Sequence, residues 1–289
     1  MILSSPSTLS HRNADRKLTP LLALTASGAA LLLLLVLIFL LRESWPVLSN
    51  GGWLRFVSDQ SWHPLEGSFG LMPMVWATLA VACGAIIIAA PFGLAGALFE
   101  YFYAAPMLAR VYRMMVVLLA GIPSVVFGLW GLTVLVPLIA RWQPPGASLF
   151  TAIVILALMI LPTVALTSSA ALRSVPDALL HGAAALGMTR KGIVTGVAIP
   201  AAHSGILGGV LLATARALGE TMAVLMVAGN VVQNPTGLFE PVRVLTANIA
   251  LEMAYATGDH RAGLFASGLL LTLMVLVLAG LAARSERRG

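Results

Sequence analysis

An arginine and a glutamate four residues apart are the residues of this sequence best suited to chemistry. Arg216 and Glu220 lie in the stretch ARALGETMAV, inside a segment that is otherwise apolar from residue 206 to residue 229. If this segment is one helix, both side chains lie on the same face, one turn apart. An ionisable group at bilayer depth costs at least ~2.5–3.5 kcal/mol, so such residues mark pathways for polar solutes.

The same pair has a structural interpretation, in which both side chains bond to neighbouring helices and clamp them together. A desolvated ion pair rarely recovers its desolvation cost, and arginine before glutamate is the weaker order for a pair within one helix. Apolar residues would therefore stabilise the protein better. The sequence favours a polar station in a translocation path, to which Thr221 and Asn230 could add hydrogen bonds.

The elements that must position this pair are membrane-spanning helices. The chain has 289 residues, of which 59% are hydrophobic and only 10% are charged, against about 25% charged residues in an ordinary soluble domain. Helices of about 20 apolar residues cross a ~30 Å hydrocarbon layer. Six stretches qualify and predict an all-α membrane protein with six transmembrane helices, at residues 20–41, 73–97, 114–140, 148–172, 204–230 and 262–283.

The Lys and Arg residues outside these stretches predict the orientation of the chain. Cytoplasmic loops are enriched in them, and the richer set is Arg12, Arg16, Lys17, Arg110, Arg113, Arg173, Arg190, Lys191, Arg284, Arg287 and Arg288, against Arg42, Arg55, Arg141, Arg243 and Arg261. Both termini are therefore expected in the cytoplasm. This divides the chain into a cytoplasmic tail 1–19, a first helix 20–41 that is not cleaved, a loop 42–72 on the outer side, a membrane-spanning core 73–283 and a cytoplasmic tail 284–289.

The sequence lacks the signals of a nucleic-acid-binding protein and of a nucleotide-binding protein. The net charge of +6 could suggest nucleic acid, but the basic residues form no dense patch interleaved with aromatics, so no nucleic-acid partner is expected. No G-x-x-x-x-G-K-[ST] loop occurs that could hold nucleotide phosphates. If ATP drives the protein, another chain must bind it.

The third stretch is interrupted by AGIPSVVFGLWG, residues 120–131. Pro123 removes a backbone donor and bends a helix, and glycines allow close approach of backbones. Broken helices are tolerated in membranes where they line a cavity. We therefore expect Pro123 to lie in the substrate pathway. The segment 240–260 is only moderately apolar and begins with a turn at a proline, so it could form a short helix that lies outside the membrane or dips into it.

The stretch from residue 173 to residue 203 is too long and too apolar for a simple turn. A short helix is expected after Pro176, with Gly187 ending it or turning the chain sharply. A second segment then leads back to the membrane. Such a projecting helical element has a shape that docks in a groove of another protein, although a pair of helices resting on the bilayer is also physically possible.

The segment HGAAALG, followed by Pro200, resembles the EAA loop of ABC-importer permeases. The match places Ala183, Ala184, Gly187 and Pro200 in a loop that contacts the ATPase subunit, with His181 standing where that family usually has glutamate. The segments LLAGIPSVVFGLWGL, ILPTVALTSSAALRSVP, RALGETMAVLMVAGN and LTANIALEM resemble phosphate-specific permeases of the PstC type more specifically, and cover most of the chain.

This resemblance implies a MetI-like fold and a type I importer in the bacterial inner membrane. Its expected partners are a second permease of the PstA type, a cytoplasmic ATPase dimer, a periplasmic phosphate-binding protein and a sensor-kinase signalling complex. The chain would be no enzyme and would bind no cofactor, with ATP and Mg held by the ATPase. A guanidinium binds phosphate bidentately, and Glu220 could accept a hydrogen bond from a P–OH group, which sulfate lacks.

Three alternatives remain at this point. The chain could be a permease for another oxyanion, such as sulfate or molybdate. A secondary transporter working alone would predict an internal inverted repeat holding the site, and the RALGE segment has no convincing repeat. A scaffold for signalling needs no charges inside a span.

Overall fold

The computed structural model describes residues 8–51, 54, 56 and 61–286. Within them, five helices are long and apolar enough to cross a membrane, at Leu22–Ser49, Met72–Tyr103, Leu149–Arg173, Arg190–Leu218 and Gly258–Leu281. A bent pair, Pro106–Ala120 and Ser124–Ala140, adds a sixth if it is counted as one span. The predicted class of a polytopic helical membrane protein is confirmed.

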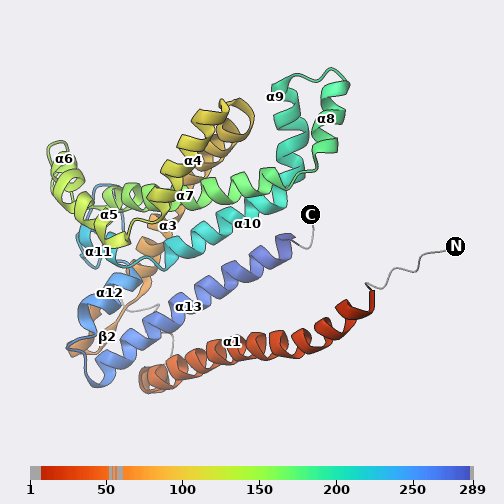
Figure 1. The fold of residues 1–289 in the computed structure, drawn as a ribbon. Coiled ribbons are helices and arrows are strands. Elements are labelled where there is room, and N and C mark those ends of the chain that lie inside the picture. Colours follow the sequence, from red (N-terminus) through yellow and green to blue (C-terminus); the bar gives the residue numbers. More distant parts are fainter. Residues whose placement is uncertain (1–7, 52–53, 55, 57–60, 287–289) are drawn as a thin grey trace.

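The described chain contains helices and one short hairpin (Figure 1). The α-helices are α1 Thr8–Gly51, α3 Met72–Leu98, α4 Pro106–Ala120, α5 Ser124–Trp130, α6 Val136–Ala140, α7 Leu149–Arg173, α8 Asp177–Ala185, α9 Arg190–Ile193, α10 Ile199–Leu218, α11 Met222–Val227, α12 Leu245–Glu252 and α13 Gly258–Glu286. The π-helical turns are η2 Phe99–Tyr103, η3 Gly131–Leu135 and η4 Val194–Ala198. The hairpin pairs β1 Trp62–His63 with β2 Ser68–Phe69 around the 3-10 turn η1 Pro64–Glu66.

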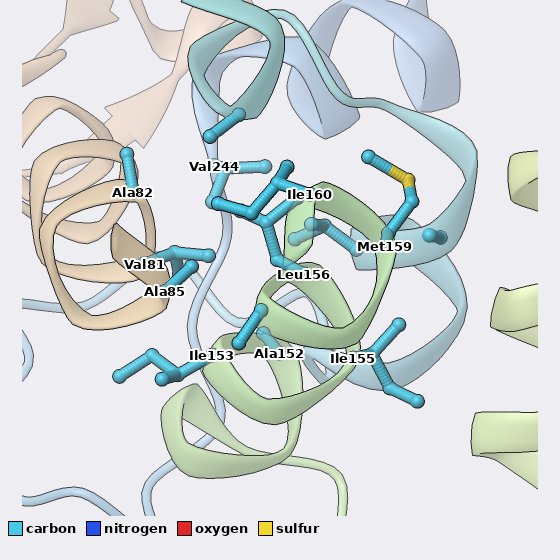
Figure 2. Packing of buried hydrophobic residues seen from close by; sticks show 14 of the residues in the cluster. Val81, Ala82, Ala85, Ala152, Ile153, Ile155, Leu156, Met159, Ile160 and Val244 are labelled. Atoms are coloured by element: carbon cyan, nitrogen blue, oxygen red, sulfur yellow. The ribbon is translucent and has the colours of Figure 1, made fainter. Parts of the chain in front are cut away.

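The core lies where α3 crosses α7. Val81, Ala82 and Ala85 of α3 face Ile153 and Leu156 of α7, and all five side chains are buried (Figure 2). The small residues on α3 allow close approach of the two helices, as is usual between helices in membranes. This pair forms the scaffold against which α10 and α11 pack.

The remaining long helices form successive layers beside this core. In Figure 1, α10 lies along α7, α13 lies along α10, and α1 lies along α13 at the edge of the molecule. Most described side chains of α1 between residues 22 and 41 are exposed. The beginning of the described part of α1, the end of α13 and the α8–α9 pair lie toward one end, and β2 and α12 lie toward the other.

Several predicted helix bounds were wrong. Helix α1 begins at Thr8 and ends at Gly51, so it includes part of the expected tail 1–19 and part of the expected loop 42–72. Helix α4 begins at residue 106 rather than 114, after an extended Ala105. The expected span 204–230 ends as a helix at Leu218. By contrast, α7, α12 and α13 lie close to the positions expected for them.

The projecting element between α7 and α10 has the predicted shape. Helix α8 follows Pro176 and ends before Gly187, whose φ of +76° is favourable for glycine. The segment after it, which was expected only to lead back to the membrane, is helical and continues through η4 into α10. The π-helical turn η4 ends at Ala198, and Pro200 is the second residue of α10, a position near the helix start where proline is tolerated.

Candidate functional site

The predicted pairing of Arg216 and Glu220 on one helical face is wrong. Helix α10 ends at Leu218, the chain is not helical from Gly219 to Thr221, and α11 then begins at Met222. Glycine at residue 219 lowers the local helix propensity by about 1 kcal/mol. We call residues Gly219–Thr221 the break.

Glu220 is held in the break by three hydrogen bonds, one of which its backbone N–H donates to the carbonyl of Ala217 at 3.3 Å. One carboxylate oxygen, Oε1, accepts from the backbone N–H of Ala223 at 3.1 Å and so caps α11. The hydroxyl of Thr246, on α12, donates to the carbonyl oxygen of Glu220 at 2.8 Å. Thr221 is half-buried and donates weakly to the carbonyl of Gly219 at 3.4 Å. The second carboxylate oxygen of Glu220 keeps its acceptor capacity.

Arg216 occupies the last turn of α10, where a cation interacts favourably with the helix dipole. Its side chain is exposed. Within the described residues it makes no ion pair with Glu220 or with any other carboxylate. The guanidinium therefore retains its donors beside a helix break that carries a carboxylate.

The interruption predicted at Pro123 is present as a complete break. Helix α4 and the helical segment Ser124–Ala140, which begins with α5, meet at an angle of 91°, and Pro123 is exposed directly before α5. Helix α5 packs on α11, which begins directly after the break at Gly219–Thr221. A Cβ atom on Gly128 of α5 would lie 3.0 Å from Cα of Ala223 on α11. The two broken segments are thus in close backbone contact, and a side chain at residue 128 would require neighbouring atoms to shift.

Asn230 closes the far end of α11. Its Nδ2 donates to the carbonyl of Leu225 at 2.8 Å, and its φ is +57°, a conformation that asparagine adopts more readily than most residues. Its Oδ1 is buried without a hydrogen-bond partner in the described structure. Asn230 therefore shapes the end of α11 through its side chain.

The residues of the predicted coupling loop differ in exposure. Ala183 is buried against the protein, whereas Ala184, Gly187 and Pro200 are exposed. The most exposed large apolar side chain of the loop is that of Leu186, beside Gly187, which is 85% exposed. Leu179 on α8 is also exposed. His181 is exposed and stands on the same helix.

Two buried carboxylates were missed by the sequence reasoning. Glu100, in η2, accepts from Nε and Nη2 of Arg113 at 2.8 and 2.6 Å, from Nη2 of Arg173 at 3.0 Å and from Ser169 at 3.0 Å. We call these four residues the Glu100 cluster; it joins η2 to the middle of α4 and to the end of α7. The sequence signal was a single acidic residue between apolar and aromatic residues, in LFEYFY.

The second missed carboxylate is Glu252, at the end of α12. Oε2 accepts from Nε1 of Trp62 at 2.8 Å and lies 2.8 Å from Nε2 of His260, and Oε1 lies 2.6 Å from Nη1 of Arg243. Burial raises the pKa of Glu252, but the hydrogen bonds from Trp62 and His260 and the charge of Arg243 outweigh it, so the pKa lies below its ordinary value. We call these four residues the Glu252 network.

The fold defines the class of the protein as a polytopic helical membrane protein with two broken helices and a projecting helical pair. The family model described as binding-protein-dependent transport system inner membrane component matches residues 89–288. The chain therefore belongs to this family.

Particular relatives within the family carry more specific names. The phosphate transport system permease protein PstC of Mesorhizobium japonicum is 36% identical over 89% of this chain and 86% of its own length. PstC of Haemophilus influenzae is 35% identical over 90% of each chain, and the probable ABC transporter permease protein YqgH of Bacillus subtilis is 37% identical over 81% and 79%.

Solved structures show the same fold at low sequence identity. A chain of a bacterial alginate ABC transporter superposes with a TM-score of 0.65 at 19% identity, over 96% of this chain and 98% of that one. A chain of the MetNI methionine ABC transporter gives a TM-score of 0.63 at 20% identity, over 79% and 99%. The predicted MetI-like permease fold is confirmed.

Proposed function

We propose that this chain is the membrane-spanning permease subunit of an ATP-driven importer of inorganic phosphate. The observation that carries the proposal is the break after α10, where the exposed Arg216 forms no ion pair within the described residues and the next carboxylate along the chain is that of Glu220. The substrate follows from the PstC relatives that match most of the chain. Arg216 and Glu220 line the path, with Thr221 and Pro123 at the neighbouring turns of the backbone.

The chemistry of this site suits a protonated phosphate. A planar guanidinium binds two oxyanion oxygens at once, which the point charge of lysine does not reproduce. The oxygen of Glu220 that does not cap α11 can accept a hydrogen bond from P–OH. Fully ionised sulfate brings no such proton and would meet an unpaired carboxylate, so this site discriminates against it. The alternative functions are permeases for molybdate or sulfate. Competition by these anions for phosphate uptake distinguishes them from a phosphate permease.

Energy for transport comes from a partner ATPase dimer, which binds ATP and Mg. The chain itself is no enzyme and holds no cofactor in this proposal. Helix α8 and the exposed Leu186 form the surface that docks on the ATPase. A second permease of the PstA type completes the path on the exposed side of α5 and α11, where Val125, Val126, Leu129 and Met222 are exposed.

The protein lies in the bacterial inner membrane with both termini in the cytoplasm. The distribution of Lys and Arg supports this orientation, and so does the placement of α8–α9 toward the same end as the start of the described α1 and the end of α13 (Figure 1). The opposite end, with the β1–β2 hairpin and α12, then receives a periplasmic phosphate-binding protein. A sensor-kinase complex is a further proposed partner.

The test is ATP-driven phosphate uptake by the reconstituted complex in proteoliposomes. Arg216→Gln and Glu220→Gln are compared with wild type, with Arg110→Gln, an exposed arginine on α4, as the matched control. Assembly and ATPase activity are followed in the same samples, with sulfate and molybdate as competitors. We expect Arg216→Gln to assemble and hydrolyse ATP but to move no phosphate. Normal uptake by Arg216→Gln, or failure to assemble, would show that Arg216 does not line the path.

A further inference from the structure

The Glu252 network joins parts of the chain that are far apart in sequence. Trp62 belongs to the β1–β2 hairpin, Arg243 precedes α12, and His260 lies in the first turn of α13. One carboxylate contacts all three, at 2.6–2.8 Å, and its side chain is only 10% exposed. The hairpin, α12 and α13 are therefore held to one another at a single buried charge.

Helix α12 connects this network to the break. Thr246 lies in the first turn of α12 and donates to the carbonyl of Glu220 at 2.8 Å, and Glu252 ends the same helix. The start of α12 is also anchored to α3, because the hydroxyl of Thr78 accepts from the N–H of Leu245 at 3.0 Å. A helix this short moves as one body, so a displacement at Glu252 reaches the main chain of Glu220.

Arg243 connects the same network to the other end of α11. Its Nε donates to the carbonyl of Asn230 at 2.9 Å, and Asn230 in turn holds the carbonyl of Leu225. Both ends of α11, the helix that follows the break, are thus bonded to groups that Glu252 holds. Nη1 of Arg243 also donates to Oδ1 of Asn248 at 3.1 Å, within α12.

Two atoms of these residues are buried without a hydrogen-bond partner in the described structure, Nδ2 of Asn248 and Oδ1 of Asn230. Buried polar groups are nearly always bonded, and leaving one unbonded costs free energy.

We propose that Glu252 is a positioning residue for transport. It couples the docking of a binding protein on the β1–β2 hairpin to the conformation of the break at Glu220. Trp62 transmits the position of the hairpin to the carboxylate, and Thr246 transmits the position of α12 to the main chain of Glu220. The inference rests on the proposed function, because it requires that the break lines the translocation path of the anion. It concerns the response to docking rather than contact with the anion.

The experiment measures ATPase activity of the reconstituted complex with and without phosphate-loaded binding protein. Thr246→Val removes the hydroxyl with little change in shape, whereas Thr246→Ser retains it. Glu252→Gln removes the charge that Arg243 and His260 face. Glu66→Gln is the control for the hairpin, because Glu66 is an exposed carboxylate of η1 outside the network.

We expect Thr246→Val and Glu252→Gln to keep the basal ATPase rate and to lose stimulation by at least about fivefold, the lower range for coupled sites. Thr246→Ser and Glu66→Gln should keep the stimulation of wild type. The double variant Thr246→Val/Glu252→Gln should lose no more than the worse single variant, because both act on one connection.

Several results would overturn the inference. Full stimulation in Thr246→Val would do so, as would equal losses in Thr246→Ser and Thr246→Val, or losses that add in the double variant. If Glu252→Gln does not assemble, the stimulation of the ATPase measured for Thr246→Val decides between the inference and its rejection. The outcome is separate from that of the proposed function: Arg216→Gln tests passage of phosphate, whereas these variants test stimulation of the ATPase.

Discussion

The Glu100 cluster predicts that a chain destabilised by loss of both arginines regains stability when the charge of Glu100 is removed as well. The carboxylate of Glu100 is 4% exposed, whereas the side chains of Arg113 and Arg173 are 42% and 46% exposed. If both arginines are replaced by glutamine, the buried carboxylate is left without a cation. Breaking a buried pair in this way costs about 3–5 kcal/mol.

The reverse change, Glu100→Gln, should cost less. The two arginines are each partly exposed and can be hydrated when the carboxylate is gone, and the new amide can still bond to Ser169. We expect a loss of about 1.5–3 kcal/mol, the range for a hydrogen bond to a charged group, because the amide and the hydrated arginines recover part of the lost contacts. Adding Glu100→Gln to the Arg113→Gln/Arg173→Gln variant should therefore recover about 2 kcal/mol, because it removes the unpaired buried charge.

The assay is the free energy of unfolding of the full chain in mixed detergent micelles, titrated with SDS and followed by circular dichroism. Arg110→Gln, three residues before Arg113 on the same helix and exposed, is the matched control and should leave the free energy unchanged. The reasoning is refuted if the triple variant is no more stable than the double variant. It is also refuted if Glu100→Gln alone is as destabilising as the double arginine variant.

Three further predictions concern other parts of the molecule. The pKa of Glu252 is lowered in the folded chain, so its contribution to stability is complete above the ordinary value of 4.5 and is lost as the pH falls through the folded pKa; melting curves should show this loss in wild type and not in Glu252→Gln. Gly128→Ala would place a Cβ 2.8 Å from Sδ of Met226 and should cost about 1–3 kcal/mol in the SDS titration, whereas Gly182→Ala on α8 meets nothing within 4 Å and should be neutral or slightly stabilising. Leu186→Asp places a charge directly after α8, on the surface proposed to dock on the ATPase, and should lower the yield of ATPase that co-purifies with the complex, without lowering the stability of the chain; an unchanged yield would count against docking there.

The sequence alone determined the class of the protein and the positions of most helices. Apolar runs of sufficient length predicted α7 and α13 because the hydrophobic requirement of a span is a sum over neighbouring residues. Proline and glycine act locally as well, so the broken segment at Pro123 and the turn at Gly187 were foreseen from their residue types. The similarity of whole segments to PstC-type permeases was also readable without coordinates, and the family is confirmed.

Only the tertiary structure decided how the charged residues are arranged. Hydropathy continued a helix through Glu220, but α10 ends at Leu218 because the polar groups of the break find partners in Ala223 and in Thr246, 26 residues away. The Trp62 donor to Glu252 comes from 190 residues away. A buried carboxylate is tolerated only when cations and donors surround it, and which residues supply them depends on the packing of distant segments, which no local pattern in the sequence records.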